Sequence, residues 1–125
     1  MRLSQCHNFH DFRQLAKRRL GPIVNYIDGG ADDETTLRQN TSSFDHCDLL
    51  PSVLTGVSDV DMSVTVMGQK LDMPVYCSPT ALQRLFHHKG ERAVAVAAEK
   101  YGTMFGVSSL GTVSLEELRQ KHKNP

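Results

Sequence analysis

The sequence has 125 residues, enough for one modest domain, and its 39% hydrophobic but only 6% aromatic content predicts a mostly aliphatic core. Lys plus Arg equals Asp plus Glu at 14 each, so the zero net charge gives no overall attraction to nucleic acid or to an anionic membrane. No apolar run approaches the roughly 20 residues that span a bilayer, and the N-terminus lacks the apolar centre of a secretory signal. The three widely spaced cysteines fit reduced thiols in a cytoplasmic protein.

The first 61 residues predict helices followed by a connector. Asn8 can cap a first helix, in which apolar residues recur at helical spacing. Pro22 is suited to open a short second helix, which the glycine pair at 29–30 ends. A third, mostly polar helix is expected over about 32–44, starting at either of two aspartates. Residues 45–61 are expected to form an extended connector.

From residue 62 the apolar period changes to two, which is typical of strands. Val64 and Val66 alternate with polar residues, and the chain returns after a glycine. We therefore expect residues 62–72 to form a small hairpin with a type II′ turn at Gly68-Gln69.

Residues 73–125 predict two parallel βα units. A strand over 73–77 precedes a helix from about Gly90, and a strand over 103–107 precedes a helix that Ser114 caps in a capping box. We expect the first helix to bury Ala93, Val94, Ala97, Ala98 and Tyr101, and the last helix to bury Leu115 and Leu118. A barrel of eight such units takes about 250 residues, so this chain predicts part of one, ending where a third strand is expected.

Both predicted strands end in small hydroxylated residues, Ser78-Pro79-Thr80 and Ser108-Ser109. Ligands of α/β sheets and barrels bind at the carboxyl ends of the strands, so these two tips favour a ligand site. The alternative is that Thr80 and Ser108 only terminate their strands or form turns. Gln83 in the next loop is equally well a loop residue or a neighbour of the ligand.

Other candidate residues have simpler interpretations. Tyr26, beside two isoleucines on the second helix, is by pattern alone a packed tyrosine. His87-His88 is interpreted as a loop, because adjacent histidines rarely face one ion and no Cys or carboxylate spacing completes a metal site. Cys77 is expected to be a small buried residue, and Lys17-Arg18-Arg19 a solvated helix face.

Four stretches together resemble one enzyme family: NYIDGGADDETTLRQN (25–40), MSVTVMGQKLDMPV (62–75), SPTALQRLFHHKGE (78–91) and GVSSLGTVSLEEL (106–118). In their order and spacing the sequence closely resembles the FMN-dependent α-hydroxy acid dehydrogenases and oxidases, from about Phe9 to Gln120. Leu110 stands where glycolate oxidases usually have Trp. With this leucine, the SLGT stretch is more similar to the bacterial lactate dehydrogenase branch of the family.

The resemblance implies an α/β fold, the N-terminal part of a (β/α)8 TIM barrel with FMN at the carboxyl ends of the strands. One partial domain is expected over 1–125, with helices and connector over 1–61, the hairpin over 62–72 and two βα units over 73–125. The resemblance places Pro79, Thr80 and Ala81 along the flavin edge and the Ser108 hydroxyl at its pyrimidine end. It implies that the Tyr26 phenol binds the substrate carboxylate, and it implies no metal site.

The activity implied is oxidation of an L-2-hydroxy acid, L-lactate to pyruvate, by a homo-oligomer that is cytoplasmic or peripheral at the inner membrane. The family's catalytic histidine, arginine and lysine belong to later strands, so no catalytic residue is expected in this chain. The chain alone is expected to be inactive and unstable. Two alternatives stay open: a truncated, non-catalytic or partner-associated chain, and another FMN barrel enzyme such as an isomerase, against which Tyr26 argues. The electron acceptor cannot be read from the sequence.

Overall fold

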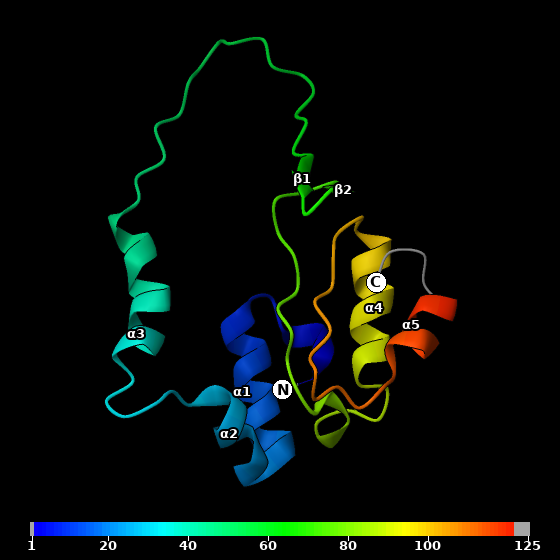
Figure 1. Cartoon of the computed structure of the whole chain (residues 1–125). Helices are drawn as coiled ribbons and strands as arrows, with labels where there is room; N and C mark the ends of the chain where they lie inside the picture. The colour runs from blue at the N-terminus through cyan, green and yellow to red at the C-terminus, as the bar shows by residue number, and fades with distance from the viewer. Residues whose placement is uncertain (1, 122–125) are drawn as a thin grey trace. The chain divides into compact units, whose positions relative to one another are not determined.

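The computed structural model describes residues 2–121 and consists of two compact units, one up to Thr55 and one from Gly56 (Figure 1). Helices make up the first unit, whereas the second contains a hairpin, two extended segments and two helices. No helix in the described range is long and apolar enough to cross a bilayer.

The N-terminal helices begin and end where local signals predict. Helix α1 spans Phe9–Leu20, and the side chain of Asn8 caps it by accepting a hydrogen bond from the backbone N–H of Asp11 at 3.0 Å. A 3-10 turn with Pro22 near its start leads into α2, Val24–Asp28, which ends at Gly29. These boundaries confirm the predicted caps and breakers.

The third helix starts later than predicted. Helix α3 spans Thr35–Ser42 and continues as a 3-10 turn over Ser43–His46. Asp32 and Glu34 have φ values of 47° and 56°, a left-handed conformation that cannot belong to an α-helix, so the predicted start was wrong.

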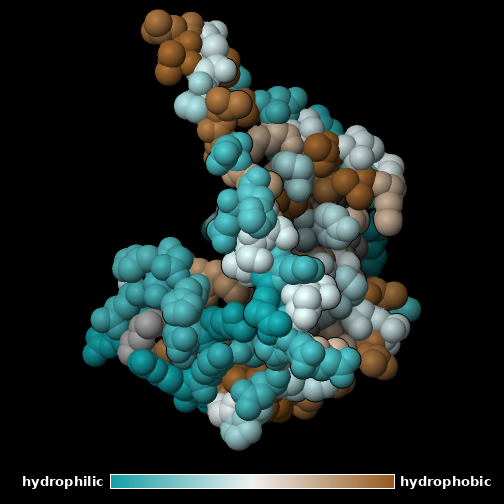
Figure 2. Space-filling view, turned by 90° about the vertical axis from the view of Figure 1, so that its left-hand side faces the viewer, coloured by the Kyte–Doolittle hydropathy of each residue, from teal (hydrophilic) through white to brown (hydrophobic). Residues whose placement is uncertain are grey.

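Residues 47–63 form no regular structure, as expected for a connector. Its large apolar side chains are exposed: Leu49, Leu50, Val53, Leu54, Val57, Val60 and Met62. Figure 2 shows apolar residues on the part of the chain that forms the top of Figure 1. The connector therefore contributes apolar surface but no core.

The hairpin is present with a different turn from the predicted one. Strand β1, Val64–Val66, pairs antiparallel with β2, Gln69–Leu71, and Val66 faces Gln69. The turn residues are thus Met67 and Gly68, whose positive φ values of 48° and 78° are typical of type I′ rather than type II′. Pairing of buried Leu71 with Val64 sets this register.

The two predicted parallel strands are extended segments joined by one parallel bridge, between Cys77 and Phe105. The backbone of Cys77 donates to the carbonyl of Met104 at 3.0 Å, and Gly106 donates back to Cys77 at 2.9 Å. The order and direction of the strands are confirmed, but a longer ladder is not formed. A parallel pair is stable chiefly when neighbouring strands and helices cover it, and only one pair is present in the described residues.

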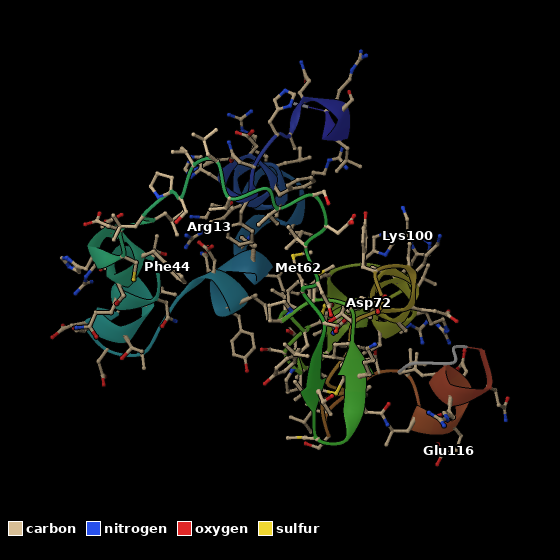
Figure 3. All side chains as sticks on the ribbon, turned by 90° about the horizontal axis from the view of Figure 1, so that it is seen from above. Arg13, Phe44, Met62, Asp72, Lys100 and Glu116 are labelled. Carbon is tan, nitrogen blue, oxygen red and sulfur yellow. The ribbon has the colours of Figure 1, made fainter. Side chains whose placement is uncertain are left out.

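Where the chain enters these segments, a glycine makes a close approach possible. The backbone of Asp72, labelled in Figure 3, donates to the carbonyl of Gly102 at 2.8 Å. Gly102 has a φ of 58°, and a Cβ there would lie 1.8 Å from Oδ2 of Asp72. Only glycine combines this backbone conformation with this contact.

Helices α4, Glu91–Lys100, and α5, Leu115–Lys121, complete the second unit. The buried core consists of Ala95, Ala98, Phe105, Val113 and Leu118. The predicted buried side of α4 was partly wrong, because Ala93, Ala97 and Tyr101 are exposed whereas Ala98 is buried. The buried face of α4 instead contains Glu91, Ala95 and Ala98.

Helix α5 has the predicted cap, since Ser114 Oγ accepts a hydrogen bond from the backbone of Glu117 at 3.2 Å. Leu118 is buried as expected, but Leu115 in the first turn is exposed. An ion pair between Arg92 Nε and Glu117 Oε1 at 2.7 Å joins α4 to α5.

Candidate functional site

The carboxyl ends of the two extended segments lie together and form the candidate site. The first tip, residues 78–81, packs against the second segment so closely that a Cβ on Gly106 would lie 3.2 Å from Cδ of Pro79. Beyond the tips, the backbone of Leu82 donates to the carbonyl of Leu110 at 3.2 Å. The structure therefore brings the tip containing Pro79, Thr80 and Ala81 next to the loop that contains Ser108.

The first tip presents backbone donors for a ligand. Within residues 2–121, no group accepts a hydrogen bond from the N–H of Thr80 or Ala81. Thr80 is exposed and Ala81 half-buried, and their short side chains leave these N–H groups approachable. The carbonyl of Thr80 is held by Gln83, whose Nε2 donates to it at 3.1 Å. Such an edge suits a flat ring with acceptor atoms at its rim.

Ser108 presents a hydroxyl at the second tip. Its Oγ accepts a hydrogen bond from the backbone of Leu110 at 3.2 Å, and its carbonyl accepts one from Gly111 at 2.9 Å. Because the hydroxyl acts as an acceptor within the loop, its own proton is available to a ligand. Both tips thus supply donors, which matches the acceptor-rich edge of an isoalloxazine.

A buried carboxylate behind the two loops was missed in the sequence analysis. Glu91 is 0% exposed, and its carboxylate accepts hydrogen bonds from the backbone N–H and the hydroxyl of Thr112 at 2.7 and 2.6 Å. Burial, the largest effect, raises the pKa of Glu91, but the hydrogen bonds from Thr112 and from the backbone at Gln83 and Glu91 bring it below the ordinary value. The carboxylate is therefore charged at neutral pH.

A signal for Glu91 is hard to find in the sequence. An acidic residue at the start of a helix is ordinarily explained by the helix dipole. The preceding Gly90 is more telling, since its φ is 51° and a Cβ there would lie 2.5 Å from Cγ of Arg84. That constraint indicates a tightly packed corner at Gly90. It does not reveal Thr112, the hydrogen-bond partner of Glu91, which is distant in sequence.

Tyr26 lies on α2 in the first unit and is 79% exposed, so the interpretation as a packed tyrosine was wrong. Its ring and phenol are accessible to a ligand. Two residues on, Asp28 binds Arg13 and, at 2.7 Å, the ammonium of Lys17. The hydrogen bond from Arg13 is the main cause, followed by that from Lys17, of the lowered pKa of Asp28. Lys17 therefore has a structural partner and is not only solvated.

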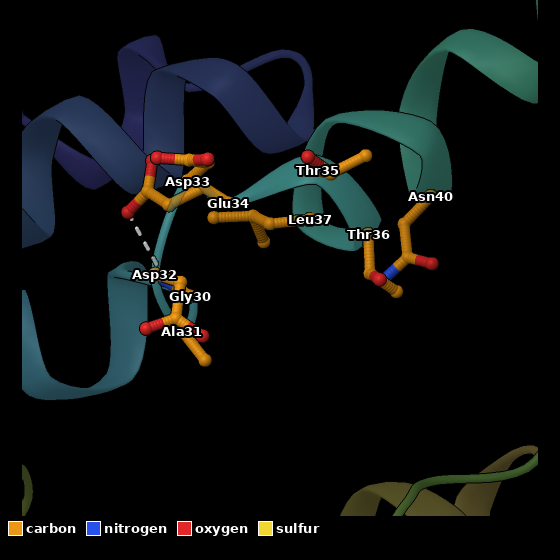
Figure 4. Close-up of a pocket in the computed structure, with 9 residues that line it drawn as sticks. All are labelled: Gly30, Ala31, Asp32, Asp33, Glu34, Thr35, Thr36, Leu37 and Asn40. Carbon is orange, nitrogen blue, oxygen red and sulfur yellow. Dashed lines mark hydrogen bonds between the residues drawn. The ribbon is translucent and has the colours of Figure 1, made fainter.

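Two of the hollows in the first unit differ in polarity. One, of about 530 Å3, is lined by residues 30–40, and in it the backbone of Gly30 donates to Glu34 Oε1 at 3.1 Å (Figure 4). Its carboxylates, Asp32, Asp33 and Glu34, disfavour an anion such as a hydroxy acid or a phosphate. The other, of about 390 Å3, is mostly apolar and lies between α1, α2 and α3. Neither hollow matches the predicted ligand as well as the strand tips do.

The remaining candidates have local contacts. The rings of His87 and His88 lie 4.4 Å apart, and His87 Nδ1 accepts a hydrogen bond from the backbone of Lys89 at 3.3 Å, as in a loop. Across residues 2–121, no three His, Cys, Asp or Glu side chains gather where they could hold a metal ion. Cys77 is half-buried and packs against the core.

Comparisons with known proteins show which family the chain resembles. The family model described as FMN-dependent dehydrogenase matches residues 16–125. Glycolate oxidase 1 of Oryza sativa subsp. indica is 38% identical over 117 residues, which cover 93% of this chain and 32% of that protein. L-lactate oxidase of Nostoc sp. is 40% identical over 119 residues, covering 94% and 33%.

Solved structures show the same similarity. A soluble mutant of the membrane-associated (S)-mandelate dehydrogenase from Pseudomonas putida superposes with a TM-score of 0.82 at 34% identity, covering 90% of this chain and 33% of that one. The chain thus spans about a third of the length of the relatives it matches. Its α/β fold corresponds to the N-terminal part of the TIM barrel of these FMN-dependent hydroxy acid oxidases, which confirms the predicted fold class.

Proposed function

The chain belongs to the FMN-dependent dehydrogenase family, and from this premise we propose that the protein in which it occurs oxidises an L-2-hydroxy acid, namely L-lactate to pyruvate. The family and its dependence on FMN are established by the match over residues 16–125. The substrate, the reaction and the roles of individual residues are part of the proposal.

The observation that carries the proposal is the pair of joined strand tips. Thr80 and Ala81 offer backbone N–H groups without partners among residues 2–121, and Ser108 offers a hydroxyl proton. We propose that these donors hold the edge and the pyrimidine end of FMN, with Pro79 lining the same edge. When bound, FMN supplies the two-electron acceptor for the α-carbon of the substrate. The chain's contribution is to bind and orient that ring.

Tyr26 is proposed to bind the substrate. An exposed phenol on a helix can donate a hydrogen bond to a carboxylate, and a charge-assisted bond of this kind is stronger than a neutral one. The ring is not engaged in packing, which leaves it available for this purpose. Its role is to fix the carboxylate of the hydroxy acid, so that the α-carbon is correctly oriented.

L-lactate is favoured over glycolate by one residue. Leu110 stands where the resemblance gives glycolate oxidases a Trp, whereas the identities to L-lactate oxidase of Nostoc sp. (40%) and to glycolate oxidase 1 of Oryza sativa (38%) are nearly equal. We also propose that the 125 residues alone do not turn over substrate. This part of the proposal rests on the family resemblance, which implies that the proton-accepting histidine belongs to a later strand, and proton transfer by a positioned base typically contributes about 10²–10⁴-fold to the rate.

The test is an assay of the whole protein with FMN, an artificial electron acceptor and each of L-lactate, D-lactate and glycolate. We expect FMN-dependent turnover that is fastest with L-lactate, and none from the 125-residue polypeptide assayed in parallel. Tyr26→Phe should raise KM for L-lactate about tenfold at unchanged Tm. Failure to bind FMN, or a Tyr26→Phe variant with unaltered KM, would contradict the proposal. Flavin binding without turnover of any of the three acids would favour a non-catalytic role.

A further inference from the structure

We propose that Glu91 is a positioning residue that holds the two flavin-contacting loops in fixed relation to each other. The inference rests on the proposed function for the identity of the ligand. It assigns a purpose to the buried charged side chain that the binding site itself does not use.

One arm of the arrangement runs to the second loop. Both oxygens of Glu91 are occupied by Thr112, Oε1 by its backbone N–H at 2.7 Å and Oε2 by its hydroxyl at 2.6 Å. Gly111 lies so near that a Cβ on it would be 3.6 Å from Glu91 Oε1, and its N–H donates to the carbonyl of Ser108. The carboxylate therefore fixes the segment that carries the Ser108 hydroxyl.

The other arm runs to the first loop. The Gln83 side chain donates to the carbonyl of Thr80 at 3.1 Å. The backbone of Arg84 also donates to the hydroxyl of Thr112 at 3.4 Å. Arg84 thus connects the first loop to Thr112, and the Thr112 hydroxyl donates in turn to Glu91, so that one carboxylate anchors the link between the two loops that face the proposed flavin.

A carboxylate serves this purpose better than a neutral amide. The backbone N–H and the hydroxyl of Thr112 both donate to it, and it can accept from both without reorientation. Hydrogen bonds to a charged acceptor are roughly twice as strong as neutral ones. A glutamine would turn an NH2 group toward a donor, so at least one bond of the set would be lost.

The test compares Glu91→Gln, Thr112→Val and Thr112→Ser in the whole protein. The readouts are FMN Kd from flavin fluorescence quenching, the flavin absorption spectrum and Tm. Glu91→Gln and Thr112→Val should each weaken FMN binding at least tenfold and shift the spectrum, and the double variant should be no weaker than the worse single one. Thr112→Ser keeps the hydroxyl and should stay within twofold of the wild type.

Leu118→Ala is the matched control, because Leu118 is a core residue on α5 and belongs to neither loop. It should lower Tm while leaving FMN Kd within twofold. If Glu91→Gln behaves like this control, with a lower Tm but normal FMN Kd and spectrum, Glu91 is merely structural and the inference is wrong.

If the wild-type protein binds no FMN, the proposed function fails, but the inference can still be judged by amide hydrogen exchange. Glu91→Gln should then speed exchange at Leu82 and Thr112 at least tenfold relative to the amides of α5. Equal acceleration in the loops and in α5 would overturn it.

Discussion

The two units of the molecule differ in how they bury their apolar residues. The second unit has a core of five buried apolar side chains, from both of its helices and the segments between them. Among residues 2–55, by contrast, only Leu15 and Val24 are buried apolar side chains, and Phe9, Tyr26 and Phe44 are largely exposed. The second unit is thus built as a support for a fixed site, whereas local caps and ion pairs define the first.

The largest expected effect comes from the core of the second unit. Leu118 is 1% exposed and Leu49, in the connector, 94%. Leu118→Ala should cost about 2–5 kcal/mol of unfolding free energy through lost burial and a cavity, and Leu49→Ala less than about 0.5 kcal/mol. Urea unfolding measures both. A similar cost for the two would mean that another part of the protein covers the connector, and the contrast would fail.

Two glycines with nearly the same φ sharpen the comparison. Gly21 has a φ of 60° with nothing within 4 Å of an added Cβ, and Gly102 has a φ of 58° with Asp72 at 1.8 Å. Gly21→Ala should cost about 1–3 kcal/mol, because its φ of 60° with a ψ of −146° is a conformation that side-chain-bearing residues rarely adopt. Gly102→Ala should cost about 1–3 kcal/mol more because of the clash.

Thermal unfolding of both glycine variants gives the difference. Adding Asp72→Ala to Gly102→Ala should recover part of the loss but leave Gly21→Ala unaffected. Equal costs for the two substitutions would show that Asp72 moves aside to accommodate a Cβ at position 102.

The pH dependence of stability should report the buried charge of the second unit. The pKa of Glu91 is lowered from 4.5 on folding, so its ionised form stabilises the folded state above about pH 4.5. This stabilisation is lost as the pH falls through the lower, folded-state pKa. Denaturation followed between pH 6 and 2.5 should show a shallower acid loss for Glu91→Gln than for the wild type. Parallel curves would mean that Glu91 is not charged when folded.

The smallest effect is expected in the first unit, at the half-buried ion pairs of Asp28, in which the two cations are more than a third exposed. Its pKa is lowered from 3.8, mainly by Arg13, and the pairs are accessible to salt. Asp28→Asn should therefore destabilise slightly at low ionic strength and hardly at all in 1 M salt, where the Debye length is about 3 Å. The effect of Glu91→Gln should persist in 1 M salt. If 1 M salt removed the effect of Glu91→Gln but not that of Asp28→Asn, the assignment of Glu91 as the screened-from-solvent carboxylate and Asp28 as the salt-accessible one would be wrong.

Features set by neighbouring residues could be predicted from the sequence. The caps at Asn8 and Ser114 are examples, because each depends on a donor three residues away. The strand–helix alternation and the strand tips were also predictable from patterns that repeat along the chain. These sufficed to place the candidate site residues from 79 to 81 and Ser108 at one edge.

What could not be predicted depends on contacts between distant residues. The hairpin turn moved by one residue because pairing of Val64 with Leu71 sets the register. The inward face of α4 turned because Glu91, a charged residue, is buried against Thr112. No rule based on apolar spacing predicts a buried glutamate, and the partner that makes its burial favourable is 21 residues away.

The hydrogen bond from Leu82 to Leu110 joins the two loops through backbone atoms alone. The side chain at position 110 can therefore be exchanged, Leu for Trp for instance, without loss of this hydrogen bond. Positions 91 and 112 have no such freedom, since their link is made of side chains. Across homologues, a change at position 91 should be accompanied by a change at position 112, whereas position 110 should vary independently of both.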